Sequence, residues 1–385
     1  MVILTPGKWR QSIHICRQQI HDTSVKATMN LQETIAKALL LPFSLIYGLG
    51  VNLRNFFYQT KMLKSVTFDV PVISVGNLSV GGAGKTPHIE YLIELLQPYI
   101  NVATLSRGYK RKTKGFLLVN TTHTAEEVGD EPLQYKRKYP DVFVTVSENR
   151  ALGIPRLMMM NADTQVILLD DAFQHRAVTP GLNILLTEYS RLYTDDFLLP
   201  VGRLREWPSA AGRADIIIVT KCPSLISTED REKVRSRIHP EKHQHLFFTY
   251  YDYPRKPYNI FDSRYAIELN EKLDVLMVSG IARADYLVDW LNTKVNSVRL
   301  LEYADHHFFS ASDIGHIEKV FNSIESDNKV IITTEKDAVR FQLHFDYISR
   351  QKIPVYALPA KVSFHFNEAD SFNDHIKHFL MEFRA

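Results

Sequence analysis

The sequence contains few cysteines and no strong excess of charge. Only two cysteines occur in 385 residues, Cys16 and Cys222, and they are far apart and without the spacing of a metal site. A disulfide framework is therefore excluded, and a reducing compartment is expected. The 46 basic and 43 acidic residues leave a net charge of +3 without a concentrated basic stripe. The chain is therefore not expected to bind nucleic acid.

The first 28 residues lack the run of about 7–15 apolar residues that a secretory signal needs. They are predominantly polar, so we expect residues 1–28 to be a disordered leader without an assigned function. Met29 is an alternative start of the protein.

An uncharged segment follows at residues 38–53. As a helix it would be roughly 24 Å long, which is short of the roughly 30 Å hydrocarbon core of a membrane. Lysines and arginines flank it, among them Lys37 and Arg54. It is either a helix buried against its own domain or a helix lying in the cytoplasmic leaflet with basic anchors. We favour the second interpretation and expect residues 29–65 to form a membrane-associating helix.

Short β-branched runs alternate with helical patterns between residues 66 and 225. The runs are continuous rather than alternating in polarity, which favours a parallel sheet covered on both faces. We therefore predict an α/β protein of the P-loop NTPase type, with a doubly wound, mostly parallel sheet. The expected strands are residues 70–75, 102–105, 142–146, 166–169, 184–186 and 216–219.

The composition of the sequence changes near residue 225, where a charged helical stretch precedes an aromatic run, HLFFTYYDY. Further apolar segments separated by helices follow. We predict a second, smaller α/β domain over residues 226–385. Two extended runs, HLFFTYYDY and PVYALPAKVSF, are expected to form a ribbon that joins the domains.

A phosphate-binding loop is predicted between an apolar strand and a helix in PVISVGNLSVGGAGKTP. The usual pattern G-x-x-x-x-G-K-[ST] is complete except for its first glycine, which is Ser79 here. Glycines permit the positive φ angles that turn backbone N–H groups toward an anion, and a helix N-terminus then faces it. The residues expected to bind the nucleotide are Ser79, Val80, Gly81, Gly82, Ala83, Gly84, Lys85 and Thr86.

Such a site needs acidic residues for Mg²⁺, which the Thr86 hydroxyl also binds. Asp170 and Asp171 follow an apolar strand in VILLDDAFQH, where the metal-binding carboxylate belongs. Proteins of this class that select guanine usually carry N/T-K-x-D after a late strand. In VTKCP the aspartate position is Pro223, which argues against GTP.

Transfer of a phosphoryl group to an alcohol requires a carboxylate or histidine near the attacking oxygen. One candidate pair is Asp130 and Glu131, although an acidic pair at a helix start is also a common capping arrangement. A second candidate is Asp305 with His306 and His307, which is equally compatible with a surface turn. The basic segment LSRGYKRKTKG suits an anionic substrate or lipid headgroups, or is a solvated loop.

Taken together, these segments resemble the tetraacyldisaccharide 4'-kinases (lipid A 4'-kinases) of Gram-negative bacteria. The similarity extends from about residue 30 to the end, through SVGNLSVGGAGKTP, LSRGYKRK, VGDEP, LDDAFQHR, GRLRE, RADIIIVTKCP, SGIAR, YADHHFF and TTEKDAVRF in this order. The family has serine at the position of Ser79. Trp207 departs from it, since relatives tend to have proline after LRE.

The resemblance implies ATP and Mg²⁺ as cosubstrate and metal, and the 4'-hydroxyl of an acylated glucosamine disaccharide 1-phosphate as acceptor. It implies that Asp130 is the base, helped by His306, and that Lys85 and Thr86 hold phosphates and metal. Glu131, Asp170 and Asp171 would organise the metal and the hydroxyl. Residues expected near the substrate are Arg107, Tyr109, His175 and His307.

Because this acceptor stays in the bilayer, the resemblance also implies a peripheral or singly anchored protein on the cytoplasmic face of the inner membrane, without a protein partner. Two alternatives remain. A P-loop ATPase or GTPase switch, or a metallochaperone, would hydrolyse nucleotide without a lipid product. A soluble kinase for a small sugar or nucleoside would not need residues 30–60.

Overall fold

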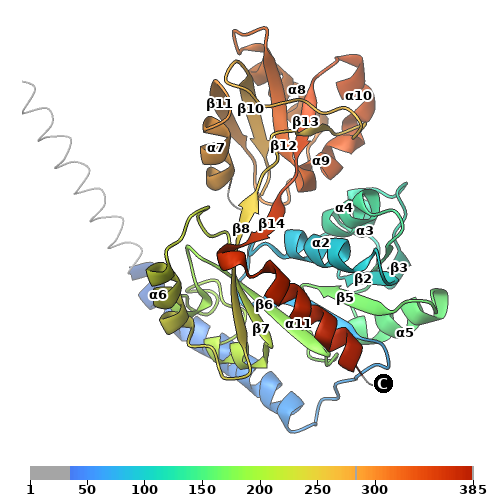
Figure 1. Cartoon of the computed structure of the whole chain (residues 1–385), viewed down its shortest axis with the longest axis vertical. Coiled ribbons are helices and arrows are strands. Elements are labelled where there is room, and N and C mark those ends of the chain that lie inside the picture. Colours follow the sequence, from blue (N-terminus) through green and yellow to red (C-terminus); the bar gives the residue numbers. More distant parts are fainter. Residues whose placement is uncertain (1–34, 282–283, 384–385) are drawn as a thin grey trace, which may run out of the picture.

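The computed structural model describes residues 35–281 and 284–383. The predicted leader, residues 1–28, lies outside them. Figure 1 shows a larger α/β domain and a smaller one, connected by two extended strands. This arrangement confirms the predicted α/β class with mostly parallel sheets.

The larger sheet is built from nine strands within the described residues. In chain order they are β1 (Val72–Asn77), β2 (Val102–Ser106), β3 (Leu117–Leu118), β4 (Phe143–Val146), β5 (Val166–Asp170), β6 (Leu182–Glu188), β7 (Ile216–Thr220), β8 (His245–Asp252) and β14 (Lys361–Phe364). Their order across the sheet is β14-β8-β7-β6-β1-β5-β2-β4-β3, and only β3 and β14 run antiparallel to their neighbours. β1 is central and completely buried, because VISVGN presents apolar or small residues to both faces.

Helices cover both faces of this sheet. They are α2 (Lys85–Leu96), α3 (Ala125–Val128), α4 (Asp130–Lys138), α5 (Arg150–Met160), α6 (Thr228–Ile238) and α11 (Ala369–Glu382), with 3-10 turns η1 (Tyr193–Asp195), η2 (Pro208–Arg213) and η4 (His365–Asn367). Separate apolar clusters lie on the two sides of β1, one under α2 and one under α5. The two faces of each strand are therefore buried, as the continuous apolar runs require.

The smaller sheet has five described strands in the order β11-β10-β12-β13-β9. They are β9 (Tyr258–Asn259), β10 (Asp274–Ser279), β11 (Ser297–Glu302), β12 (Lys329–Thr334) and β13 (Val355–Leu358). The accompanying helices are α7 (Asp285–Asn292), α8 (Ala311–Asn322), α9 (Glu335–Phe341) and α10 (Phe345–Arg350), with the turn η3 (Gln342–His344).

The sheets divide the chain differently from the predicted boundary at residue 226. β8 and β14 pair antiparallel with each other, and β8 pairs parallel with β7 of the larger sheet. Phe372 and Ile376 of α11 are buried in the core of the larger domain. The smaller sheet therefore occupies only residues 258–358, and the predicted range of 226–385 was too wide. The chain leaves the larger domain after β8 and returns to it at β14 (Figure 1).

The N-terminal helix spans Ile35–Gln59, which lies within the expected range of residues 29–65 and extends beyond the uncharged segment at residues 38–53. At about 1.5 Å per residue its 25 residues reach roughly 37 Å. Ser44 donates a hydrogen bond to the Leu198 carbonyl at 3.0 Å, and the Trp207 indole donates to the Gly48 carbonyl at 3.3 Å. A Cβ at Gly48 would lie 2.6 Å from the Trp207 ring. The unusual Trp207 therefore packs the helix against the larger domain.

Candidate active site

The phosphate loop connects β1 to α2, as the sequence predicts. Gly81 and Gly84 have φ angles of 109° and 90°, which residues other than glycine rarely adopt. The Val80 N–H donates to the Arg203 carbonyl at 2.7 Å, and the Arg205 N–H donates to the Leu78 carbonyl at 2.7 Å. The segment GRLRE thus fixes the outer side of the loop, and Ser79 forms a β-bridge with Leu204 instead of a tight glycine turn.

Lys85 is held at the end of β1 by polar partners. Its ammonium donates to Asn77 Oδ1 at 3.0 Å and lies 3.6 Å from Asp171. Arg205 donates to both Asn77 Oδ1 and Asp171, at 2.7 and 2.9 Å. Burial would raise the pKa of Asp171, but Lys85 and Arg205 outweigh it and hold the pKa below its ordinary value. Two cations therefore face one ionised carboxylate here.

Tyr135 connects Asp170 to the site near the first turn of α2. The Tyr135 hydroxyl donates to Asp170 Oδ2 at 3.1 Å, and Thr86 lies close to this hydroxyl. Asp170 Oδ1 is buried and has no hydrogen-bond partner within the described chain. Burial, and then the nearby Glu131 carboxylate, raises the pKa of Asp170 to about 7. An oxygen ligand without a partner at this place is suited to a cation.

The opposite side of the site combines the start of α4 in the larger domain with residues of the smaller domain. Asp130 begins α4. Its Oδ2 accepts a hydrogen bond from His306 Nδ1 at 2.9 Å and forms a close ion pair with Arg340. Arg340 lies on α9 and also pairs with Asp337 at 2.8 Å. Burial raises the pKa of Asp130, but Lys336, His306 and Arg340 outweigh burial and leave the pKa far below its ordinary value.

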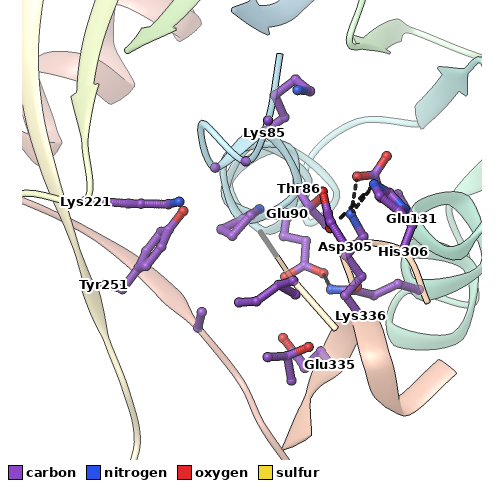
Figure 2. A pocket seen from close by; sticks show the side chains of 18 of the residues that line it. Lys85, Thr86, Glu90, Glu131, Lys221, Tyr251, Asp305, His306, Glu335 and Lys336 are labelled. Atoms are coloured by element: carbon purple, nitrogen blue, oxygen red, sulfur yellow. Dashed lines mark hydrogen bonds and ion pairs between the residues drawn. The ribbon is translucent and has the colours of Figure 1, made fainter. Parts of the chain in front are cut away.

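One cavity of about 320 Å³ contacts both sides of the site. Figure 2 shows Glu131, His306 and Lys336 together on one side of the Lys85–Thr86 turn, and Lys221 and Tyr251 on the other. The lining residues include Ser79, Val80, Gly81, Gly82, Gly84, Lys85, Thr86, Tyr109, Glu131, Asp171, Arg205, Lys221, Tyr251, Tyr286, Asp305, His306 and Lys336. The predicted loop and the acceptor-side candidates are thus brought to one cavity.

Six of the predicted site residues do not line this cavity, namely Ala83, Arg107, Asp130, Asp170, His175 and His307. Asp130 is behind His306, and Arg107 is exposed on the neighbouring loop. His175 Nε2 accepts the Arg150 backbone N–H at 3.2 Å, and burial lowers the pKa of this imidazole to about 4. His307 is hydrogen-bonded to Asp313 at 3.0 Å. Of the two adjacent histidines, only His306 therefore faces the cavity.

Several site residues were not identified from the sequence. Arg205, Lys336 and Arg340 occur in GRLRE and TTEKDAVRF, which contributed to the resemblance without a role for these side chains. Tyr135 lies in a charged helix and had no local signal at all. The motifs could have suggested Lys336 and Arg340 only with knowledge that α9 packs against α4.

Replacing Gly84 with alanine is expected to destabilise the protein by at least about 1–2 kcal/mol, the cost of a left-handed backbone for a residue with a Cβ. The new Cβ would also lie 2.3 Å from the Tyr251 hydroxyl oxygen. Thermal unfolding measures the effect. Gly50→Ala is the control, because a Cβ there meets no atom within 4 Å. A Tyr251→Phe background should recover part of the loss at Gly84 and nothing at Gly50.

His88 on α2 predicts a pH-dependent stability. Its Nδ1 lies 2.7 Å from the Gly84 carbonyl and its Nε2 lies 3.1 Å from Thr249 Oγ1. Burial lowers the pKa of His88 to about 4, against 6.5 when unfolded. Its contribution to stability is therefore complete above pH 6.5 and is lost as the pH falls toward 4, by up to about 3 kcal/mol.

Urea unfolding between pH 7.5 and 4.5 tests this pH dependence. His88→Gln should flatten the dependence, whereas His243→Gln, at an exposed position, should leave it unchanged. Equal slopes in the wild type and both variants would contradict the assignment to His88.

Comparison with known proteins agrees with this geometry. A family model described as tetraacyldisaccharide-1-P 4'-kinase (LpxK) matches residues 36–381. The tetraacyldisaccharide 4'-kinase of Flavobacterium johnsoniae is 44% identical over 348 residues, which are 90% of this chain and 98% of the relative. That of Parabacteroides distasonis is 45% identical over 347 residues, 87% and 92% of the two chains.

Among solved structures, the crystal structure of LpxK from Aquifex aeolicus in complex with ATP is similar at a TM-score of 0.67 and 29% identity. The similarity covers 90% of this chain and 99% of that one. The resemblance inferred from the motifs is thereby confirmed, and the chain belongs to the tetraacyldisaccharide-1-P 4'-kinase family, the lipid kinases of lipid A biosynthesis.

Proposed function

We propose that the chain transfers the γ-phosphate of ATP to the 4'-hydroxyl of a membrane-embedded tetraacyldisaccharide 1-phosphate, giving lipid IVA, on the cytoplasmic face of the inner membrane. The observation that carries the proposal is the shared cavity. Lys85 and Thr86 line it from the phosphate loop, and Glu131 and His306 line it from the other side. A donor and an acceptor can therefore meet there.

The nucleotide is proposed to bind the loop from Ser79 to Thr86, with Lys85 on the β- and γ-phosphates. The solved relative from Aquifex aeolicus was crystallised with ATP, which supports adenine rather than guanine. Pro223 at the position of the guanine-reading aspartate supports the same choice.

The oxygen ligands around Thr86 fit Mg²⁺. Asp170 has a buried, unpartnered Oδ1, and Thr86 lies near the Tyr135 hydroxyl that donates to Asp170 Oδ2. Mg²⁺ usually binds one or two carboxylates together with substrate phosphates and water rather than an all-protein cage. Accordingly, the described residues contain no group of three His, Cys, Asp or Glu arranged around a metal. We propose that Thr86, Asp170 and Asp171 hold Mg²⁺, which would neutralise charge on the phosphates.

The acceptor proton is proposed to leave through Asp130 and His306. In the transfer, a bond forms from the sugar oxygen to the γ-phosphorus, the bond between the γ-phosphorus and the bridging oxygen to ADP breaks, and the hydroxyl proton goes to the protein. His306 lines the cavity and Asp130 does not. The imidazole is therefore the group that meets the hydroxyl, and the Asp130 carboxylate stabilises the charge that the imidazole gains.

The N-terminal helix is proposed to hold the protein at the bilayer. Large apolar side chains cover its outer face, with Leu39, Ile46 and Leu49 each about 70% exposed. The helix is also long and apolar enough to cross a membrane.

Introducing charge on this face tests the membrane proposal. The double variant Leu45→Glu/Leu49→Glu should reduce co-sedimentation with phospholipid vesicles by at least about tenfold, from a charge cost of a few kcal/mol in lipid. Leu225→Glu is the matched control, because Leu225 is 88% exposed and lies outside the helix. Equal binding of the two variants would argue against the helix as the anchor.

The reaction is tested with γ-32P-labelled ATP, Mg²⁺ and the acylated disaccharide 1-phosphate in detergent micelles. Label should appear in the lipid, disappear in Lys85→Ala, and persist in Lys242→Ala, an exposed lysine that does not line the cavity. Release of labelled phosphate without labelled lipid would instead indicate a nucleotide-hydrolysing switch.

A further inference from the structure

We propose that Lys336 is a positioning residue of the phosphoryl transfer, whose ammonium holds His306 in the Nδ1–H tautomer against Asp130 and joins His306 to Glu131. The inference rests on the proposed function and adds a residue that lies in TTEKDAVRF, outside the phosphate loop and the acidic motifs.

The contacts of Lys336 converge on the acceptor side of the cavity. Its Nζ lies 3.0 Å from Glu131 Oε1 and 3.1 Å from His306 Nε2 (Figure 2). It lies 3.9 Å from Asp130 Oδ2. Lys336 comes from α9 of the smaller domain, whereas Asp130 and Glu131 begin α4 of the larger one. The lysine thus connects all three acceptor-side groups.

The chemistry of these groups determines the tautomer. A lysine ammonium has three donors and no acceptor, so His306 Nε2 must accept its hydrogen bond. The proton of a neutral imidazole is then on Nδ1, which donates it to Asp130 Oδ2 at 2.9 Å. In this tautomer Nε2 carries the lone pair that a hydroxyl proton needs. The acceptor hydroxyl takes the place of the Lys336 ammonium at Nε2, and the ammonium then keeps its contact with Glu131, 3.0 Å away.

Among the residues that the structure describes, no other group facing His306 can replace Lys336 in this role. Arg340 Nη2 is 3.5 Å from Nδ1, which is longer than an effective hydrogen bond. Asp305 is 3.9 Å from Nε2 and is an acceptor when ionised, so it would favour a proton on Nε2, the opposite tautomer. Tyr109 contacts the ring edge-on at 4.9 Å. Lys336 is therefore the group that keeps the proton off Nε2, against the effect of Asp305.

Lys138 offers a matched comparison. Its ammonium also joins the two domains, at 2.7 Å from Glu90 on α2 and 3.0 Å from Glu335 on α9. It makes no contact with His306 among those the structure describes. If Lys336 served only to hold the domains together, its removal and that of Lys138 should have the same consequences.

The full-length protein with Lys336→Ala is compared with Lys138→Ala in detergent. We expect Lys336→Ala to lower kcat about 100-fold, the effect of a misplaced reacting group, with the KM for ATP changed less than about twofold. Ethylammonium chloride should restore part of the kcat of Lys336→Ala and none of that lost in Lys138→Ala. Nitrogen-15 NMR of histidine-labelled protein, with His306 assigned by His306→Gln, should show the Nδ1–H form in the wild type and a mixture in Lys336→Ala.

An unchanged His306 tautomer in Lys336→Ala would overturn the inference, as would equal, unrescued losses in the two variants. The two proposals fail separately. If the wild type transfers no label to lipid, the proposed function fails. The NMR comparison of the His306 tautomer in the wild type and Lys336→Ala still tests the role of Lys336. If the wild type transfers label and Lys336→Ala does so equally well, only the role of Lys336 fails.

Discussion

Arg340→Met is expected to lower the free energy of unfolding by about 3–5 kcal/mol, the usual cost of removing one partner from a buried ion pair. The Arg340 side chain is 0% exposed and pairs with Asp130 and Asp337, which are 4% and 0% exposed. Methionine fills a similar volume but leaves both carboxylates without their common cation. The loss therefore comes from uncompensated charge rather than from a cavity.

Urea unfolding followed by circular dichroism measures this effect. The matched control is Arg350→Met, the same change at an exposed position on α10, which should cost less than about 0.5 kcal/mol. Adding Asp337→Asn to Arg340→Met should recover part of the loss, because it removes one of the stranded charges. A loss no larger than that of Arg350→Met would show that the cluster does not stabilise the fold.

Arg340 also illustrates what the sequence could predict. The phosphate loop was predictable in detail because its residues are consecutive and its geometry is local: glycines with positive φ, a buried strand before them and a helix after them. The positions of Asp170 and Asp171 were predictable for the same reason, since Asp170 ends the buried strand β5 and Asp171 follows it. Arg340, in contrast, resembles any exposed arginine of an amphipathic helix until α9 is packed against α4.

The strand pairing of the ribbon was the harder part of the fold. HLFFTYYDY was recognised as extended, but nothing local shows that β8 joins the larger sheet beside β7. The sheet that a strand joins depends on pairing between distant segments. Strand propensity reflects mainly burial and packing against neighbours, so it does not identify the pairing partner. The C-terminal helix was misassigned for a related reason, because its partner, the core under α2, lies almost 300 residues earlier in the chain.

The N-terminal helix extends beyond the uncharged segment at residues 38–53, because charged residues are part of it. Lys37 and Arg54 are both inside the helix. Arg54 donates to the Gln174 carbonyl at 2.6 Å, so this charge points to the protein while the apolar side chains face outward. A count of consecutive uncharged residues cannot distinguish a helix end from one charged face.

His306→Ala is expected to lower kcat by about 10²–10⁴-fold, the range for loss of a general base, and to leave the dissociation constant of ATP nearly unchanged. His306 contacts Asp130, Lys336 and Tyr109, on the acceptor side of the cavity, and has no hydrogen bond or ion pair with the described phosphate loop. Steady-state kinetics with the lipid acceptor and calorimetric titration with ATP separate the two quantities. Equal losses in both would contradict a role confined to the acceptor.

His307→Ala is the matched control, and it decides between the two adjacent histidines. His307 is hydrogen-bonded to Asp313 and stacks on Tyr303, outside the cavity, so its removal should cost little kcat. Asp130→Asn should resemble His306→Ala, and the double variant should be no slower than the slower single one, because residues that act as a unit are not additive. Additive losses would mean that Asp130 and His306 act on different steps, and the transfer of the acceptor proton through their hydrogen bond would have to be abandoned.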